Sequence, residues 1–488
     1  MRRMRVRTLV LFVVMLSLLI PLAVAPPASA DAPPSLRIFA ANSNITVERG
    51  RHDFTDLDPG IWLTPVGGNF ELHATRPDYD TPVSLTQVDS ETGAVLRTLP
   101  ADLLQGWSGL KDFIRYRVLD VDGKVITKAI SPFCPNSYSR SRLSDEGPLT
   151  SRYPYFCYGG PFTKGMVFGI DEGWATSAIG GYYYGLGWQA PRRHYTLHVW
   201  IDPLWVEQLG IAPEDAETFV AVRVVDHGVL DEGAASPTAP TSTPSPHVPI
   251  VTDPDPATMP DLVALPAWNI GIYRRKGREY MAFNATEWNA GPGKLVVEGF
   301  RGPDQDVMDA FQYFLVDDQP VGRSPAGTME FHAGGGHDYW HFEQFTQYSL
   351  LDADLQHIVL STKQSWCLAN TDALDLLAPG ANWNGYFDPL YTSCGGPGAL
   401  WIREVLDVGY GDTYGQYQAG QAFDVTDVPN GTYYIRVSVN PFGELTEGAT
   451  DNNLEDRLVK IKGKPDHRYV VVPPWHGIDT ESDCYYCF

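Results

Sequence analysis

Short runs of alternating polar and apolar residues recur along the chain, each bounded by Gly, Pro, Asn or Asp. Runs of this length that are rich in Val, Ile, Thr and aromatic residues are typical of β-strands. Examples lie at 35–40 (SLRIFA), 83–88 (VSLTQV) and 195–201 (YTLHVWI). Asp122-Gly123 stands between two such runs and indicates a hairpin with a type I′ turn. Long amphipathic helices are hard to find, so the predicted fold class is all-β.

A proline-rich segment at 232–260 interrupts this pattern and holds too few aliphatic residues to form a core. Its composition is typical of a semi-extended linker. It separates an N-terminal β domain at 31–231 from a C-terminal domain at 261–464, which is followed by a tail at 465–488. Each domain has about 200 residues, an ordinary domain size. We therefore predict two β-sandwich-like domains joined by a Pro/Thr/Ser-rich linker.

The N-terminus carries four arginines, then an apolar run at 9–25, then Ala28-Ser29-Ala30. This order predicts a secretory signal peptide at 1–30 and an extracellular protein. An uncleaved anchor is the alternative, but the A-x-A site argues against it. No later run approaches the roughly 20 apolar residues of a transmembrane helix, so no membrane span is expected in the mature chain.

The formal charge of −23 becomes −27 when the four arginines of the signal are removed, because residues 1–30 contain no acids. Nucleic acid is an unsuitable partner for such a chain, since phosphate binding needs a basic face. An acidic field would instead concentrate cationic ligands, including amines. The simpler interpretation is that the acidity keeps an exported protein soluble.

Six cysteines in an exported chain indicate disulfides. They pair in sequence order as Cys134–Cys157, Cys367–Cys394 and Cys484–Cys487. Six cysteines nevertheless allow 15 arrangements, so the order is one choice among several. The terminal CYYC could hold a metal or a redox disulfide. A structural disulfide in the tail is preferred, because no second Cys pair or nearby His completes a metal site.

The segment 331–345 (FHAGGGHDYWHFEQF) gathers three of the twelve histidines, His332, His337 and His341. In an extended strand the period of two turns His337, Tyr339 and His341 towards one face. Imidazole suits copper, zinc, iron or nickel, so this face predicts a transition-metal site. The alternative is a Gly-rich turn with surface histidines.

Further motifs follow in a fixed order: HxYxH, FTQYSLLDA, TKQSWCL, DTYG and DVTDVPNGTYYIRVSVNP. Together they resemble the catalytic domain of the lysyl oxidase family in its exported bacterial form. The resemblance extends from about residue 260 to about residue 464. It is specific because five spaced motifs occur in the family's order, whereas each motif alone is weak.

This resemblance implies a copper-dependent amine oxidase whose organic cofactor, lysyl tyrosylquinone, is made from the protein's own Lys363 and Tyr414. Primary amines, including lysine side chains of proteins, would be oxidised by molecular oxygen to aldehydes, with release of hydrogen peroxide and ammonia. A carbonyl cofactor of this kind acts as an electron sink that the protein positions. Taken alone, Lys363 and Tyr414 would be interpreted as a surface lysine and a turn tyrosine.

The chain departs from the family at the middle metal ligand, because the family motif is H-x-H-x-H and Tyr339 stands at its centre. A phenol with its ordinary pKa near 10 is a poor ligand at neutral pH. His332 or a water could fill the vacancy. If neither does, copper binds weakly and the quinone does not form.

The resemblance also implies a structural calcium site built from oxygen ligands. Its residues would be the Asp261 carboxylate, the Leu262 carbonyl, Glu447, Asn452 and Asn453. One acid of the family pattern is replaced by Ala449, and Asp451 is a possible substitute. A polar turn is the alternative.

Two other functions stay open at this stage. One is a catalytically impaired lysyl oxidase-like protein that acts as a cell-surface or matrix binding module. The other is a zinc hydrolase using the same histidines, which is disfavoured because no Glu stands in a recognisable metal-plus-base motif.

Overall fold

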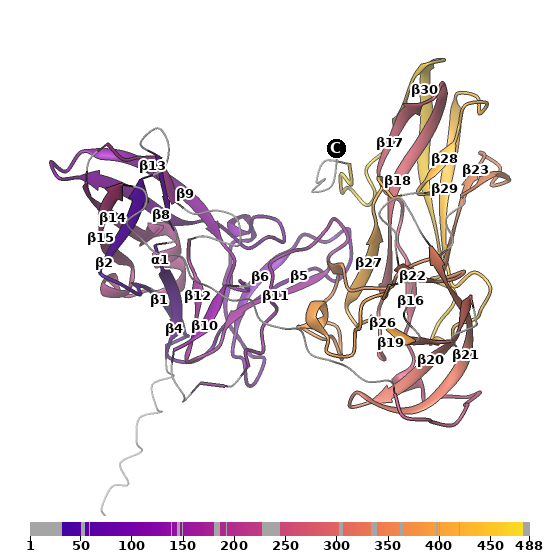
Figure 1. Ribbon diagram of the computed structural model, residues 1–488, viewed down its shortest axis with the longest axis horizontal. Coiled ribbons are helices and arrows are strands. Elements are labelled where there is room, and N and C mark those ends of the chain that lie inside the picture. The colour runs from indigo at the N-terminus through magenta and orange to yellow at the C-terminus, as the bar shows by residue number, and fades with distance from the viewer. Residues whose placement is uncertain are drawn as a thin grey trace, which may run out of the picture. The chain divides into compact units, whose positions relative to one another are not determined.

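Nearly all regular structure in the computed structural model is β-strand, which confirms the predicted all-β class (Figure 1). The described residues are 32–49, 54–57, 59–137, 139–143, 147–148, 150–179, 186–191, 193–226, 245–301, 306–332, 339–361, 365–396, 399, 401–418 and 420–481. They contain one α-helix, α1 (Pro203–Leu209). Pro203 begins this helix, Asp202 accepts the Leu204 N–H as N-cap, and Gly210 ends it with φ +63°.

The strands before residue 227 form four sheets. In sheet order they are β1 (Ser35–Ala40), β4 (Ile61–Val66), β12 (Trp174–Ser177) and β10 (Arg140–Arg142); β11 (Gly165–Ile170), β5 (Phe70–Thr75), β6 (Ser84–Val88) and β7 (Val95–Leu99); β13 (Leu186–Gln189) and β3 (Phe54–Leu57); and β2 (Asn44–Arg49), β15 (Glu217–Asp226), β14 (His194–Ile201), β8 (Leu110–Asp120) and β9 (Val125–Phe133). Short 3-10 turns lie at Ala101–Leu103 and Pro213–Asp215.

The strands after residue 245 form three sheets, and none of them includes an earlier strand. The first contains β16 (Leu262–Ala264), β17 (Trp268–Arg275), β18 (Arg278–Asn289), β27 (Tyr410–Tyr414), β25 (Asp372–Ala373) and β28 (Ala422–Asp424); the second is β22 (Tyr339–Phe342), β21 (Gln319–His332), β20 (Val307–Val316), β19 (Leu295–Phe300) and β26 (Trp401–Leu406); the third is β24 (His357–Leu360), β23 (Thr346–Leu351), β29 (Gly431–Val439), β30 (Leu454–Lys464) and β31 (His467–Val471). Short 3-10 turns lie at Pro256–Thr258 and Gly385–Phe387.

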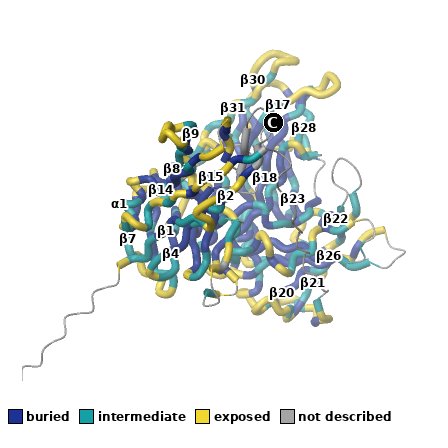
Figure 2. Tube along the Cα trace, turned by 60° about the vertical axis from the view of Figure 1, so that its left-hand side comes forward, coloured by how far each residue is buried: buried dark blue, intermediate teal, exposed yellow. Residues whose placement is uncertain are grey.

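Alternation along strand β29 places one of its faces in the core. Ile435, Val437 and Val439 are buried, whereas Arg436 and Ser438 between them are only partly so. A strand presents successive side chains to opposite faces, so this pattern buries one face and leaves the other at the surface. Buried positions therefore run along the strands while exposed positions gather at turns (Figure 2).

The predicted hairpin at Asp122-Gly123 forms between antiparallel strands β8 and β9. Gly123 has φ +76°, but Asp122 is not among the residues with positive φ. A type I′ turn needs positive φ at both positions, so that detail of the prediction is wrong. The strands stop at Asp120 and resume at Val125, which leaves a longer connection than a two-residue turn.

Two of the predicted disulfides, Cys134–Cys157 and Cys367–Cys394, are present and confirm that pairing. Cys484 and Cys487 lie outside the described residues, as do the predicted signal peptide at 1–30 and linker residues 232–244. Residues 245–260 contact the C-terminal sheets, since Ile250 bridges Arg323 of β21. The domain boundaries stay a prediction. Among the described helices, none combines the length and apolar character needed to cross a bilayer.

Candidate functional site

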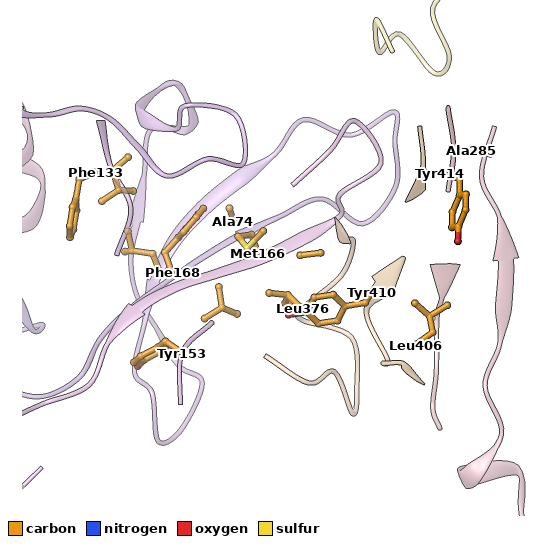
Figure 3. Packing of buried hydrophobic residues seen from close by; sticks show 14 of the residues in the cluster. Ala74, Phe133, Tyr153, Met166, Phe168, Ala285, Leu376, Leu406, Tyr410 and Tyr414 are labelled. Carbon is orange, nitrogen blue, oxygen red and sulfur yellow. The ribbon is translucent and has the colours of Figure 1, made fainter. Parts of the chain in front are cut away.

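Tyr414 ends strand β27, on which residues 410, 412 and 414 share one face. Its cross-strand partner is Ala285 of β18, and the pair Glu287 and Asp412 follows along the same two strands. Figure 3 labels Tyr414 and Ala285 among the buried residues of the core. Only 3% of Tyr414 is exposed, so its ring and hydroxyl are shielded from bulk water.

Three successive backbone amides hold the side-chain oxygens of this site. The Cys367 N–H donates to the Tyr414 hydroxyl at 2.7 Å, and the Leu368 N–H donates to Glu404 Oε2 at 2.9 Å. The Ala369 N–H donates to Asp412 Oδ2 at 3.3 Å. Because all three donors belong to one short segment, the phenol and the two carboxyl groups are gathered around the WCLA motif.

Burial changes the acid–base properties of these groups. Burial first, and then the charge of Asp412, raise the pKa of the Tyr414 phenol well above its usual value. Burial also raises the pKa of the Glu404 carboxyl well above its usual value, because a charge is poorly solvated there. Glu404 Oε1 has no hydrogen-bond donor among the described residues. Both shifts act in the direction of the protonated forms of these two groups.

The predicted metal donors lie on neighbouring strands β21 and β22. Tyr339 and His341 share a face of β22, and His332 of β21 is the cross-strand partner of Tyr339. The three rings form a stack, with centroids 4.7 Å apart for Tyr339 and His341 and 4.5 Å apart for His332 and His341. The period of two predicted that Tyr339 and His341 would face the same way, and they do.

Strand β22 is joined directly to the segment that holds Tyr414. Backbone hydrogen bonds link Phe342 and Trp366 in both directions, at 2.6 Å and 2.9 Å. The Trp366 ring packs against Tyr414 with centroids 4.1 Å apart. The hydroxyl of Tyr339 is also hydrogen-bonded to Tyr414, an interaction that opposes the rise in the pKa of Tyr339 caused by burial. The candidate metal donors and the candidate cofactor tyrosine therefore belong to one site.

The residues present fit a transition metal by their donor chemistry, because imidazole and phenolate suit oxidised copper. His332, Tyr339 and His341 supply two imidazoles and a phenol on one face of the hairpin. His337 and Lys363, the other predicted metal ligand and the predicted cofactor lysine, lie outside the described residues.

The residues predicted to bind calcium also come together. Glu447 Oε2 accepts the Leu262 N–H at 3.0 Å, and Glu447 Oε1 accepts the Asn453 side-chain amide at 2.7 Å. Asp261 Oδ1 accepts the Asn452 side-chain amide at 2.9 Å. The carbonyl oxygens of the Asn452 and Asn453 side chains are buried and have no hydrogen-bond donor among the described residues. Two carboxylates and two unsatisfied oxygens in one cluster fit a calcium ion.

Sequence reasoning missed Glu404, and it did not assign Asp412 a role although Asp412 lies inside the DTYG motif. The alternation of a strand would have placed Asp412 on the face of Tyr414. Glu404 carries a weaker signal, a carboxyl that follows Arg403 between the apolar residues at the two ends of strand β26 (WIREVL). Its role in the site depends on a hydrogen bond to the distant Leu368, which the sequence does not indicate.

Comparison with known proteins relates the part of the chain that contains this site to a protein family. The family model described as lysyl oxidase matches residues 319–470, a range that contains strands β21 and β22, the WCLA segment and Tyr414. This part of the chain belongs to the lysyl oxidase family. A human protein-lysine 6-oxidase is 29% identical over 201 residues, which are 40% of this chain and 44% of that protein. The match thus spans less than half the length of the human relative.

The lysyl oxidase match confirms the resemblance predicted from the five motifs. It begins after the residues 261 and 262 of the candidate calcium cluster and ends near the predicted end of the C-terminal domain at 464. The sheets before residue 227 lie outside the matched range, so the comparison assigns no role to the N-terminal strands.

Proposed function

We propose that the chain is an exported, copper- and quinone-dependent amine oxidase of the lysyl oxidase family. It would convert a primary amine, including the side chain of a peptidyl lysine, by the overall reaction RCH₂NH₂ + O₂ + H₂O → RCHO + NH₃ + H₂O₂. The observation that carries the proposal is the hydrogen bond from the Cys367 amide to Tyr414, beside the His–Tyr stack of strand β22. The human relative named protein-lysine 6-oxidase supports the same reaction class.

Each residue of the site has a role in this proposal. His341, Tyr339 and His337 would hold copper, with His332 as a further candidate, and Tyr414 and Lys363 would supply lysyl tyrosylquinone. When bound, copper and the quinone supply two-electron oxidation of the amine with reoxidation by oxygen. The Cys367 amide orients the Tyr414 oxygen, while Trp366 packs against its ring and excludes water.

The acidity of the chain supports a cationic substrate, because a formal charge of −23, or −27 once the predicted signal peptide is removed, attracts protonated amines over long range. The two disulfides support an oxidising, extracellular location. The cluster of Asp261, Glu447, Asn452 and Asn453 would bind calcium and tie the start of the domain to the loop after β29.

The test is peptide mass spectrometry on metal-free protein that has been reloaded with copper in air. We expect a covalent peptide that joins Lys363 to Tyr414, together with quinone absorbance and peroxide release on adding a primary amine. Lys363→Arg is the matched control, because it keeps the positive charge and cannot form the same cross-link. Unmodified Lys363 and Tyr414 peptides after copper loading would contradict the proposal.

A second function is favoured by one observation, the environment of Tyr339. Burial raises the pKa of this phenol, so it is harder to convert to the phenolate that copper would need. The chain would then be a lysyl oxidase-like binding module without oxidase activity. Tyr339→His separates the two, because it restores the family ligand: a gain of quinone only in the variant identifies the natural chain as an impaired oxidase.

A further inference from the structure

The hairpin of strands β21 and β22 carries more potential metal donors than the proposed copper site uses. Glu330 lies opposite His341 and His332 lies opposite Tyr339 in the antiparallel ladder. Cross-strand partners share a face of a sheet, so these four side chains lie on the same face. The Glu343 N–H bonds to the Thr328 carbonyl at 3.0 Å and continues the ladder, which brings Glu343 to that face as well.

Three of these residues bring their donor atoms together. The carboxylate oxygens of Glu330 and Glu343 and a ring nitrogen of His332 all lie within 4.8 Å of one another. His332 Nε2 is 3.5 Å from Glu343 Oε1. Within the described part of the chain, one other group of metal-ligating residues is as close, but it consists of Glu404 with the Cys367–Cys394 disulfide, whose sulfur atoms are already bonded.

The contacts of the histidine ring nitrogens distinguish this group from the proposed copper ligands. The rings of His332 and His341 are inclined by only 27°, with centroids 4.5 Å apart. His332 Nε2 lies 3.5 Å from Glu343 Oε1, whereas His341 Nδ1 donates to the Tyr339 carbonyl at 3.1 Å. His332 can therefore use Nε2 with the two carboxylates while His341 remains with Tyr339.

We propose that Glu330, His332 and Glu343 form a divalent-metal site with one imidazole and two carboxylate ligands, distinct from the copper site. Two carboxylates balance the charge of a divalent cation, and the mixed nitrogen and oxygen donors suit zinc, manganese or copper(II). The side chains of His332 and Glu343 are 42% and 22% exposed, so the site is open to solvent and an ion can enter. This proposal does not depend on amine oxidase activity.

A metal ion at this site would hold strands β21 and β22 together next to the proposed copper ligands Tyr339 and His341. Glu330 and His332 belong to β21, whereas Glu343 follows the last residue of β22. An ion held by all three therefore joins the two strands beside His341 and keeps its stacking partner His332 in place. Residues that do not bind a metal themselves commonly orient the side chains that do.

The experiment is isothermal titration of chelator-stripped full-length protein with Zn²⁺. Glu330→Gln and Glu343→Gln keep side-chain size and remove one charged ligand each. We expect each to weaken one class of zinc site by on the order of 10- to 100-fold or more, since losing even a group that only supports a metal ligand costs about 10- to 100-fold in affinity. The matched control is His476→Gln, because His476 also faces a carboxylate, Asp80 at 3.0 Å, but belongs to no three-residue group in the described chain.

Wild-type zinc affinity and stoichiometry in both Glu variants would overturn the proposal, as would an equal loss in His476→Gln. His332→Gln is a third variant, and circular dichroism of every variant checks that the β-structure is intact. A variant that fails to fold would indicate a structural role for that carboxylate and would count against the site. The proposed oxidase is decided separately, by the Lys363–Tyr414 cross-link, so either proposal can fail while the other stands.

Discussion

Tyr414→Phe tests whether the phenol is held by the Cys367 amide in the way that the site requires. The substitution removes the hydroxyl that accepts this N–H at 2.7 Å and keeps the ring that packs 4.1 Å from Trp366. With Tyr414 only 3% exposed, water does not readily replace the lost acceptor. A buried donor left without an acceptor costs about 1–3 kcal/mol, so we expect the free energy of unfolding to fall by that amount.

The assay is urea unfolding of the metal-free protein with both disulfides oxidised, so that cofactor formation does not contribute. The change appears as a lower urea concentration at the midpoint of unfolding, while the slope of the unfolding free energy against urea concentration stays the same. Tyr469→Phe is the control, since Tyr469 is 53% exposed. We expect its free energy of unfolding to change by no more than about 0.5 kcal/mol. An unchanged midpoint for Tyr414→Phe would refute the hydrogen bond on which the proposed site rests.

Three further predictions concern stability. Calcium should raise the thermal midpoint of the chelator-treated protein. Asp261→Asn should abolish that response, whereas Asp354→Asn, which alters an exposed carboxylate outside the candidate calcium cluster, should retain it. Burial raises the pKa of the Glu287 carboxyl well above its ordinary 4.5, so the folded state binds this proton more tightly than the unfolded state does. The free energy of unfolding, measured by urea titration at a series of pH values, should therefore fall as the pH rises above about 4.5. It should fall less steeply in Glu287→Gln. Replacing Cys134 and Cys157 by Ser opens a loop with a sequence separation of 23 and should lower the free energy of unfolding by about 3 kcal/mol.

Local features of the fold could be predicted because they depend on neighbours in the sequence. The run at 35–40 became strand β1 with the expected bounds, and the alternation of Ile435, Val437 and Val439 became the buried face of β29. The same period of two placed Tyr339 and His341 side by side. Each case needs only the geometry of a strand and the sign of residue hydrophobicity.

The environment of Tyr414 could not be predicted in that way, because it is assembled from distant segments. Glu404 and Leu368 are 36 residues apart, and Cys367 and Tyr414 are 47 apart. A hydrogen bond to a backbone amide leaves no residue pattern, since every residue except proline offers the same N–H. The ordered motifs indicated the family, but the acid groups around Tyr414 could be identified only from the structure.

Tyr339 joins the two halves of the site, and this has a consequence for copper binding. Its ring stacks on His341, and its hydroxyl is hydrogen-bonded to Tyr414, the tyrosine that copper is proposed to convert. To bind copper as a phenolate, Tyr339 must lose its proton in a buried environment that raises its pKa, a rise that the hydrogen bond to Tyr414 opposes only in part. Histidine avoids this cost, because a neutral imidazole binds a metal without losing a proton. Copper affinity and cofactor formation should therefore rise together in Tyr339→His.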